Sequence, residues 1–292
     1  MAQVKANGIT LEVERYGDPA APALLLIMGL GAQLTLWPME LVDALVGHGY
    51  HVIRYDNRDI GLSTKFDTEP VPEIPAVIAA LMNGQTPQVP YTLTDMADDA
   101  AALLDALGIA SAHVVGGSMG GMIAQLVAAN HPDKVLTLTS IFSSTGNPAL
   151  PPARPEAMAA LLGRPANADL ETLIDFGVQT ARAIGSPAYP APEADLRARI
   201  ARDIQRSFYP QGLARQFAAI VADGDRRARL QAITAPTLVI HGEDDPLVPV
   251  DGGQDTAANI AGARLHTIPG MGHDLPTELT AQIAAAIAAH AR

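Results

Sequence analysis

The feature that most constrains the fold is a series of short apolar runs, separated by segments with a helical pattern. Three of these runs are ALLLIM at residues 23–28, AHVVG at 112–116 and PTLVIHG at 236–242. A run that is apolar on both faces of a strand suits a parallel sheet, because such a sheet is covered on both sides. Strand, helix and strand in alternation predict an α/β protein with right-handed crossovers. The remaining runs lie at residues 50–55, 135–142 and 263–270.

The chain opens with a predicted hairpin. Asn7-Gly8 is the pair best suited to a tight primed turn, and alternating apolar and polar residues flank it. Its two strands and the six runs together predict a doubly wound, mostly parallel sheet of eight strands. A helix is predicted between Thr92, a good N-cap, and Gly108, a good stop signal. The Ala-rich segment at residues 276–292 predicts a C-terminal helix.

One long segment interrupts the alternation of strands and helices. Residues 146–230 are rich in proline and have a helical character, and they contain no convincing strand. Proline cannot continue a helix interior, so its clusters mark bends. We expect a helical cap at 146–230, inserted into a core domain formed by residues 1–145 and 231–292. The aromatic residues of this segment are candidates for an apolar substrate roof, although such residues more often form plain core; they are Phe176, Tyr189, Phe208 and Tyr209.

Charge and composition exclude several classes of partner and site. The chain of 292 residues has 31 acidic and 19 basic residues, a formal net charge of -12 that disfavours nucleic acids and anionic membrane surfaces. It has no cysteine, which excludes disulfides and thiolate metal sites. No run is long enough for a membrane span, and the first residues lack the apolar core of a signal peptide. We therefore expect a cytoplasmic protein without membrane insertion, and a homodimer remains open.

The stretch VVGGSMGGMIAQ, residues 114–125, places one serine between glycines two positions away on each side. A strand ending near Val115 and a helix beginning near Met119 put Ser118 on a sharp turn. Side chains at Gly116 and Gly120 would collide there, and the turn lifts the hydroxyl above the sheet edge. The alternatives are a phosphate-binding loop or a tight turn whose serine has no role.

A nucleophilic serine needs a base, and the base needs an acid that fixes its tautomer. His273 is the candidate base, because it lies in the glycine-rich loop IPGMGHDLP between the last predicted strand and the last helix. The segment HGEDDPLVP follows the preceding strand and offers three acids. We choose Asp245, and interpret Glu243 and Asp244 as residues of a solvated turn. The order Ser118, Asp245, His273 is typical of a nucleophile on a strand-to-helix turn.

Acyl transfer also requires donors for the developing oxyanion. The backbone N–H of Met119 is one candidate, and Leu30, in the loop MGLGAQLTLWP, is the other. Gly29 permits a close approach of that loop, although a merely flexible turn is an equal alternative. Trp37, close behind the loop, is a candidate pocket wall.

Four motifs carry a resemblance to a known family: GGSMGG, HGEDDPLVP, PGMGHDLP and VIRYDNRDIGLST. The chain resembles the α/β-hydrolase fold superfamily, and within it the capped bacterial esterases of the aclacinomycin methylesterase type. The resemblance covers about residues 3–145 and 230–290, not the cap. It implies a structural brace at Asp56 and Arg58. Two positions depart from the pattern: Asp59 replaces a glycine, and Met28 stands where many relatives have histidine.

These residues predict a serine carboxylic-ester hydrolase that forms an acyl-enzyme, with no metal or organic cofactor. The expected substrate is a small to medium, largely apolar ester. A cofactor-free perhydrolase or a carbon-carbon bond hydrolase would keep the same three residues, and some members of the fold are ligand receptors. Haloalkane dehalogenases and epoxide hydrolases need Asp where this chain has Ser118.

Overall fold

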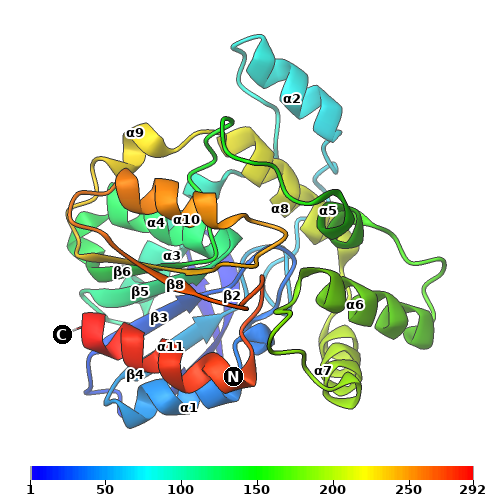
Figure 1. Cartoon of the computed structure of the whole chain (residues 1–292). Helices are drawn as coiled ribbons and strands as arrows, with labels where there is room; N and C mark the ends of the chain where they lie inside the picture. Colours follow the sequence, from blue (N-terminus) through cyan, green and yellow to red (C-terminus); the bar gives the residue numbers. More distant parts are fainter. Residues whose placement is uncertain (1, 292) are drawn as a thin grey trace.

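The computed structural model describes residues 2–291, which form one eight-stranded sheet with helices on both faces (Figure 1). The strand order is β1-β2-β4-β3-β5-β6-β7-β8. The pairs β1/β2 and β2/β4 are antiparallel, and the other five pairs are parallel. The predicted sheet is confirmed. Its strands are β1 (Ala2–Ala6), β2 (Ile9–Tyr16), β3 (Ala23–Ile27), β4 (His51–Tyr55), β5 (Ala112–Gly117), β6 (Val135–Ile141), β7 (Thr237–Gly242) and β8 (Arg264–Ile268).

Two layers of helices bury the sheet. Every residue of β3, β5 and β7 is buried, as expected of central parallel strands. Helices α1 and α11 cover one face, whereas α3, α4 and α10 cover the other (Figure 1). These helices span α1 (Met39–Gly47), α3 (Leu93–Ala106), α4 (Met119–Asn130), α10 (Val250–Ala258) and α11 (Thr277–His290). Short 3-10 turns occur at Leu34–Leu36 and Pro132–Lys134.

The turn and the helix cap that the sequence predicts are both present in the structure. Asn7 and Gly8 have φ of 47° and 76°, so both occupy the left-handed region that a primed turn requires. Thr92 caps α3 in a capping box with Asp95.

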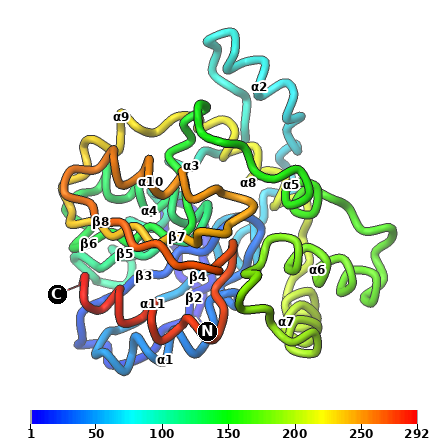
Figure 2. Tube along the Cα trace, in the orientation of Figure 1, coloured from blue at the N-terminus to red at the C-terminus, as the bar shows by residue number. Residues whose placement is uncertain are grey.

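Five helices and no strand lie between β6 and β7, in residues 142–236. Helices α6 and α7 pack on each other through a small apolar cluster formed by Ile174, Val178 and Leu196. Figure 2 shows this pair beside the sheet, next to the chain that follows β8. The helices are α5 (Pro155–Leu162), α6 (Leu170–Ile184), α7 (Glu193–Arg206), α8 (Pro210–Asp223) and α9 (Arg227–Leu230).

Helix α2 (Ile74–Met82) was not expected from the sequence and projects from the body of the molecule (Figures 1 and 2). The helix is short and contains a proline at its start, so its helical pattern in the sequence is weak. Among residues 2–291, no helix has both the length and the apolar character needed to cross a bilayer.

Candidate active site

Ser118 occupies the junction between β5 and α4. Its φ of 56° and ψ of -123° lie in the positive-φ region that residues other than glycine rarely adopt. The surrounding backbone holds this conformation, because Ser118 N–H donates to Ile141 O at 2.9 Å and Ser143 Oγ donates to Ser118 O at 2.8 Å. Such strain persists where neighbouring structure imposes it, and it is common at functional sites.

The glycines on either side of Ser118 lie against backbone atoms. A Cβ at Gly116 would approach Gly120 O to 2.0 Å, and a Cβ at Gly120 would approach Ile27 O to 2.0 Å. Neither position has room for a side chain, which is the reason that the sequence suggested. The turn can therefore form only with glycine at both positions.

His273 lies between Ser118 and Asp245. Its Nε2 is 2.9 Å from Ser118 Oγ, and its Nδ1 is 2.7 Å from Asp245 Oδ2. Its backbone N–H donates to Ile184 O at 2.8 Å, which ties the histidine loop to the end of α6. In the neutral tautomer that this geometry favours, Nδ1–H donates to the carboxylate and Nε2 accepts from the serine hydroxyl.

Asp245 is the acid that the fold brings to the histidine. Its side chain is fully buried, and its Oδ1 accepts hydrogen bonds from the N–H groups of Leu247 and Val248 at 2.9 and 2.8 Å. The neighbouring acids contact other groups at exposed positions: Glu243 accepts from Thr267 Oγ1, and Asp244 from Gly270 N–H. The buried carboxylate thus has partners on both oxygens.

A second histidine, His241, lies behind this acid and was not singled out from the sequence. Its Nε2 donates to Val248 O at 2.8 Å and is 3.7 Å from Asp245 Oδ2. Burial lowers its pKa, which favours the neutral ring. His241 thereby holds the carbonyl group of Val248, the residue whose N–H donates to the carboxylate. In the sequence, only its position beside Gly242, at the end of an apolar run, marks it.

The loop after β3 lies directly against Ser118. A Cβ at Gly29 would be 3.0 Å from Ser118 Cβ and 3.4 Å from its Oγ. Among residues 2–291, the backbone N–H groups of Leu30 and Met119 donate to no protein acceptor. The N–H of Gly31 is used differently, because it donates to Gln216 of α8 at 2.9 Å. Among the described residues, the N–H group after Ser118 and the N–H group after Gly29 are therefore both free of protein acceptors.

Asp56 connects this loop to the inserted helices. Its Oδ1 accepts from Leu34 N–H at 2.7 Å, and its Oδ2 accepts from Leu62 N–H at 2.8 Å and from Arg206 at 2.7 Å. Arg58 forms a separate buried pair with Asp99 of α3, at 2.6 Å. The two residues that the resemblance marked as one brace thus support different parts of the fold.

The aromatic candidates for substrate contact are dispersed. Trp37 is fully buried in the core beneath the loop, a core position rather than an open wall. Phe176 is half-buried beside Gly163, and Tyr189 donates to Pro269 O at 3.4 Å. Phe208 is 49% exposed, and the Tyr209 hydroxyl bonds to Asp67 and Arg215. None of these hydrogen bonds involves Ser118, Asp245 or His273.

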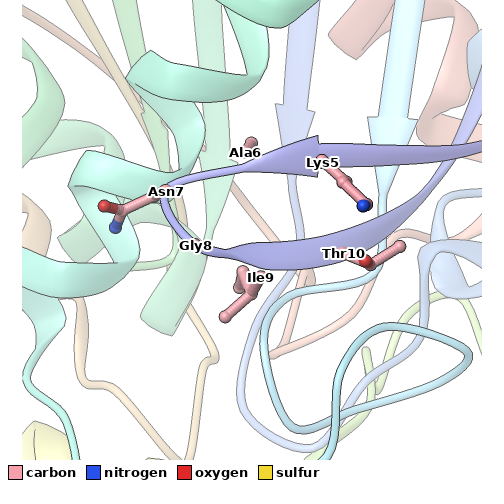
Figure 3. A pocket seen from close by; sticks show the side chains of 6 residues that line it. All are labelled: Lys5, Ala6, Asn7, Gly8, Ile9 and Thr10. Carbon is pink, nitrogen blue, oxygen red and sulfur yellow. The ribbon is translucent and has the colours of Figure 1, made fainter.

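A separate pocket lies around the N-terminal hairpin (Figure 3). It is lined by residues 5–10 alone, and none of them belongs to the serine cluster. Asn7, at its turn, instead donates to Asp99 of α3 at 2.9 Å.

Comparison with known proteins gives relatives that match nearly the whole chain. The chain is 34% identical to rhodomycin D methylesterase DauP of Streptomyces sp. strain C5, over 99% of this chain and 97% of that protein. It is 30% identical to a 2-hydroxy-6-oxononadienedioate/2-hydroxy-6-oxononatrienedioate hydrolase of Cupriavidus pinatubonensis, over 87% of this chain and 81% of that protein. Among solved structures, the enol-lactonase from Burkholderia xenovorans LB400 superposes with a TM-score of 0.71 at 26% identity, covering 98% of this chain and 96% of that one.

The family model described as alpha/beta hydrolase fold matches residues 22–278. This match begins just before β3 and ends at the start of α11, so it includes Ser118, Asp245 and His273. The resemblance indicated by the four sequence motifs is confirmed. The chain belongs to the alpha/beta hydrolase fold family.

Proposed function

We propose that this protein is a carboxylic-ester hydrolase in which Ser118 is the nucleophile, His273 the general base and acid, and Asp245 the acid that orients the imidazole. The observation that carries the proposal is the continuous chain of hydrogen bonds from Ser118 Oγ through both ring nitrogens to the buried carboxylate. A serine hydroxyl is inert at neutral pH unless a base removes its proton during attack, and this geometry supplies that base.

The reaction proceeds in two acyl transfers. Ser118 Oγ attacks the ester carbonyl carbon while its proton moves to His273 Nε2. The tetrahedral adduct collapses, and His273 returns that proton to the leaving alcohol, which produces the acyl-enzyme. A water molecule then attacks the acyl carbon and gives a proton to His273, and the second collapse releases the acid and restores the Ser118 hydroxyl.

The backbone N–H groups of Leu30 and Met119 form the oxyanion hole in this proposal. Both are free of protein acceptors among the described residues, and the contact of Gly29 with Ser118 brings their loop to the nucleophile. Preorganised donors of this kind stabilise the charge that develops on the carbonyl oxygen by about 3 kcal/mol each. The mechanism requires no metal ion or organic cofactor.

Residues 146–230 serve as a cap over the site in this proposal. The support is the contact of the α6 end with the His273 backbone and of α7 with Asp56. The name of the DauP relative contains methylesterase, which favours a small alcohol such as methanol as the leaving group of a largely apolar ester. Hydrolysis of a carbon-carbon bond is the second candidate. The substrate named for the hydrolase of Cupriavidus pinatubonensis, 2-hydroxy-6-oxononadienedioate, contains a ketone and no ester, so its hydrolysis breaks a carbon-carbon bond.

A substrate panel tests the proposal. We expect turnover of p-nitrophenyl esters with short or medium acyl chains and of methyl esters, with release of the acid and the alcohol in equal amounts. Negligible turnover of every ester, together with saturable binding, would support a ligand receptor instead. Cleavage of a vinylogous 1,5-diketone in the absence of ester cleavage would support the carbon-carbon hydrolase.

A further inference from the structure

One face of α7 contacts the loop after β3 and carries charged residues at helical spacing. Arg199, Asp203 and Arg206 are four and three residues apart, so they share that face. Asp203 Oδ1 accepts from Thr35 Oγ1 at 2.8 Å, and Arg206 donates to Gln33 Oε1 at 2.6 Å. Two of the three residues therefore bind the loop that carries Leu30, and the third, one turn earlier, faces the same side of the helix.

Arg199 lacks the partners that its neighbours have. Among residues 2–291, its guanidinium has no hydrogen-bond acceptor and no ion-pair partner, although the residue is half-buried. No nitrogen of Arg199 is sealed from solvent, so a ligand can reach the group. Burial lowers the pKa of Arg199. A guanidinium has five N–H donors, and partial desolvation without an acceptor destabilises the folded protein. A ligand or a water molecule that accepts from these donors removes the penalty.

The carboxylates nearest to Arg199 are occupied elsewhere. Asp203 and Asp274 both attract it electrostatically, but among residues 2–291 neither forms an ion pair with it. Asp274 Oδ1 instead accepts from the N–H and Oγ of Ser186, and Asp203 accepts from Thr35. Burial raises the pKa of both acids.

The same two acids relate Arg199 to the two loops of the proposed active site. Asp274 directly follows His273, and Asp203 bonds to the loop that contains Leu30. Arg199 lies one helical turn before Asp203 on the same face of α7, and it interacts electrostatically with Asp274 beside the histidine loop. In the proposed site, the chain of a substrate bound at Ser118 runs between these two loops toward Arg199.

We infer that Arg199 binds a carboxylate at the end of the substrate remote from the scissile ester. This inference rests on the proposed function and deepens it: the substrate class is a half-ester of a dicarboxylic acid, with an apolar chain between its two ends. The planar fork of a guanidinium matches a carboxylate bidentately. A dianionic phosphate fits less well, because Asp203 and Asp274 repel its second charge.

The first experiment compares charged and neutral esters of one chain length. The monomethyl and dimethyl esters of dicarboxylic acids with four to eight carbons are assayed with wild type, Arg199→Gln and Arg199→Lys. For the best half-ester, we expect Arg199→Gln to lower kcat/KM by about ten- to hundredfold, the loss expected for a charged hydrogen bond. The dimethyl ester should change less than twofold, and Arg199→Lys should retain part of the preference.

Arg202→Gln is the matched control, because Arg202 is an exposed arginine on the same helix. It should leave both substrates unaffected. A wild type that hydrolyses both esters equally well, with no differential loss in Arg199→Gln, would overturn the inference while the proposed function stands. A drop of equal size for both esters would also overturn it, because a structural defect affects them alike.

Binding without turnover separates this inference from the proposed function. Calorimetric titration of Ser118→Ala with the dicarboxylate of the preferred length should show binding that Arg199→Gln removes in the same background. Inorganic phosphate, the second probe, should bind more weakly. If the dicarboxylate binds and no ester is hydrolysed by wild type, the anion site stands and the proposed function fails. Equal binding with and without Arg199, or stronger binding of phosphate, contradicts the assignment of a carboxylate.

Discussion

Arg206, the last residue of α7, donates a hydrogen bond to the fully buried carboxylate of Asp56 at 2.7 Å. The other oxygen of that carboxylate accepts from Leu34 N–H, in the loop that lies against Ser118. The same Arg206 nitrogen donates to Gln33 of this loop at 2.6 Å. One ion pair therefore joins the inserted helices to the loop that carries the proposed oxyanion donor.

Replacing Arg206 should destabilise the protein. Arg206→Met leaves one oxygen of a buried carboxylate with a single partner, and the loss of one member of a buried pair typically costs about 3 kcal/mol. Denaturant unfolding measures this difference. Arg197→Met is the control, because its ion pairs with Glu171 and Asp175 are largely exposed and should contribute less than about 1 kcal/mol. Equal losses in the two variants would contradict a special role for the Arg206 pair.

The choice of acid is tested by two neighbouring substitutions. Asp245→Asn keeps the shape of the side chain but favours the wrong tautomer of His273, and we expect kcat to fall by a factor of about 10⁴. Asp244→Asn should stay within a few-fold of wild type, because the Asp244 carboxylate accepts from Gly270 N–H at an exposed position. Steady-state kinetics on one activated ester decide the matter. The reverse ranking would assign the role to Asp244.

Burial of His241 predicts a pH dependence of stability. Its pKa is lowered in the folded protein, so on acidification the unfolded chain binds the proton first. The free energy of unfolding should therefore decrease as the pH falls below about 6.5, the ordinary pKa of histidine. His113 and His290, whose pKa values burial also lowers, contribute in the same direction.

His241→Gln should flatten this dependence, because glutamine does not titrate and retains an N–H donor for Val248 O. The urea midpoint measured between pH 5 and pH 8 gives the slope for each variant. His48→Gln is the control, because His48 is exposed and its replacement should leave the slope unchanged. A slope that is identical in His241→Gln and wild type would mean that His241 is not held neutral.

Sequence reasoning was most effective where one residue type is required by local geometry. The primed turn at Asn7-Gly8, the cap at Thr92 and the glycines around Ser118 each follow from backbone constraints over a few residues. The order of serine, acid and histidine along the chain followed instead from the order typical of a nucleophile on a strand-to-helix turn. In the structure, the hydroxyl of Ser118 lies 2.9 Å from Nε2 of His273.

The rest of the site depends on contacts between distant segments. Arg206 and Arg199 sit on a helix whose docking on the core no local pattern specifies. Trp37 follows the loop so closely that the sequence suggested a pocket wall, but it is buried in the core. His241 lies at the end of a strand predicted as apolar, where a histidine gave no sign of its contact with Val248.

Close packing at the nucleophile turn predicts a contrast between two glycines. Gly120→Ala forces a Cβ to within 2.0 Å of Ile27 O, and backbone atoms cannot move aside cheaply, so a loss of about 3 kcal/mol or more is expected. Gly47→Ala, at the end of α1, meets nothing within 4 Å and should stabilise the helix by about 0.5 kcal/mol. Thermal unfolding of both variants provides the comparison. A Gly120→Ala protein as stable as wild type would contradict the observed packing.

The central claim is that the Ser118 hydroxyl forms the acyl-enzyme. The most direct test is kcat for ester hydrolysis by Ser118→Ala, measured beside its melting temperature and a mass spectrum after exposure to a p-nitrophenyl ester. The account predicts that kcat falls by a factor on the order of 10⁶, that no acyl adduct forms and that the melting temperature is unchanged. A folded Ser118→Ala protein with activity within tenfold of wild type, or an acyl adduct on another residue, would contradict it.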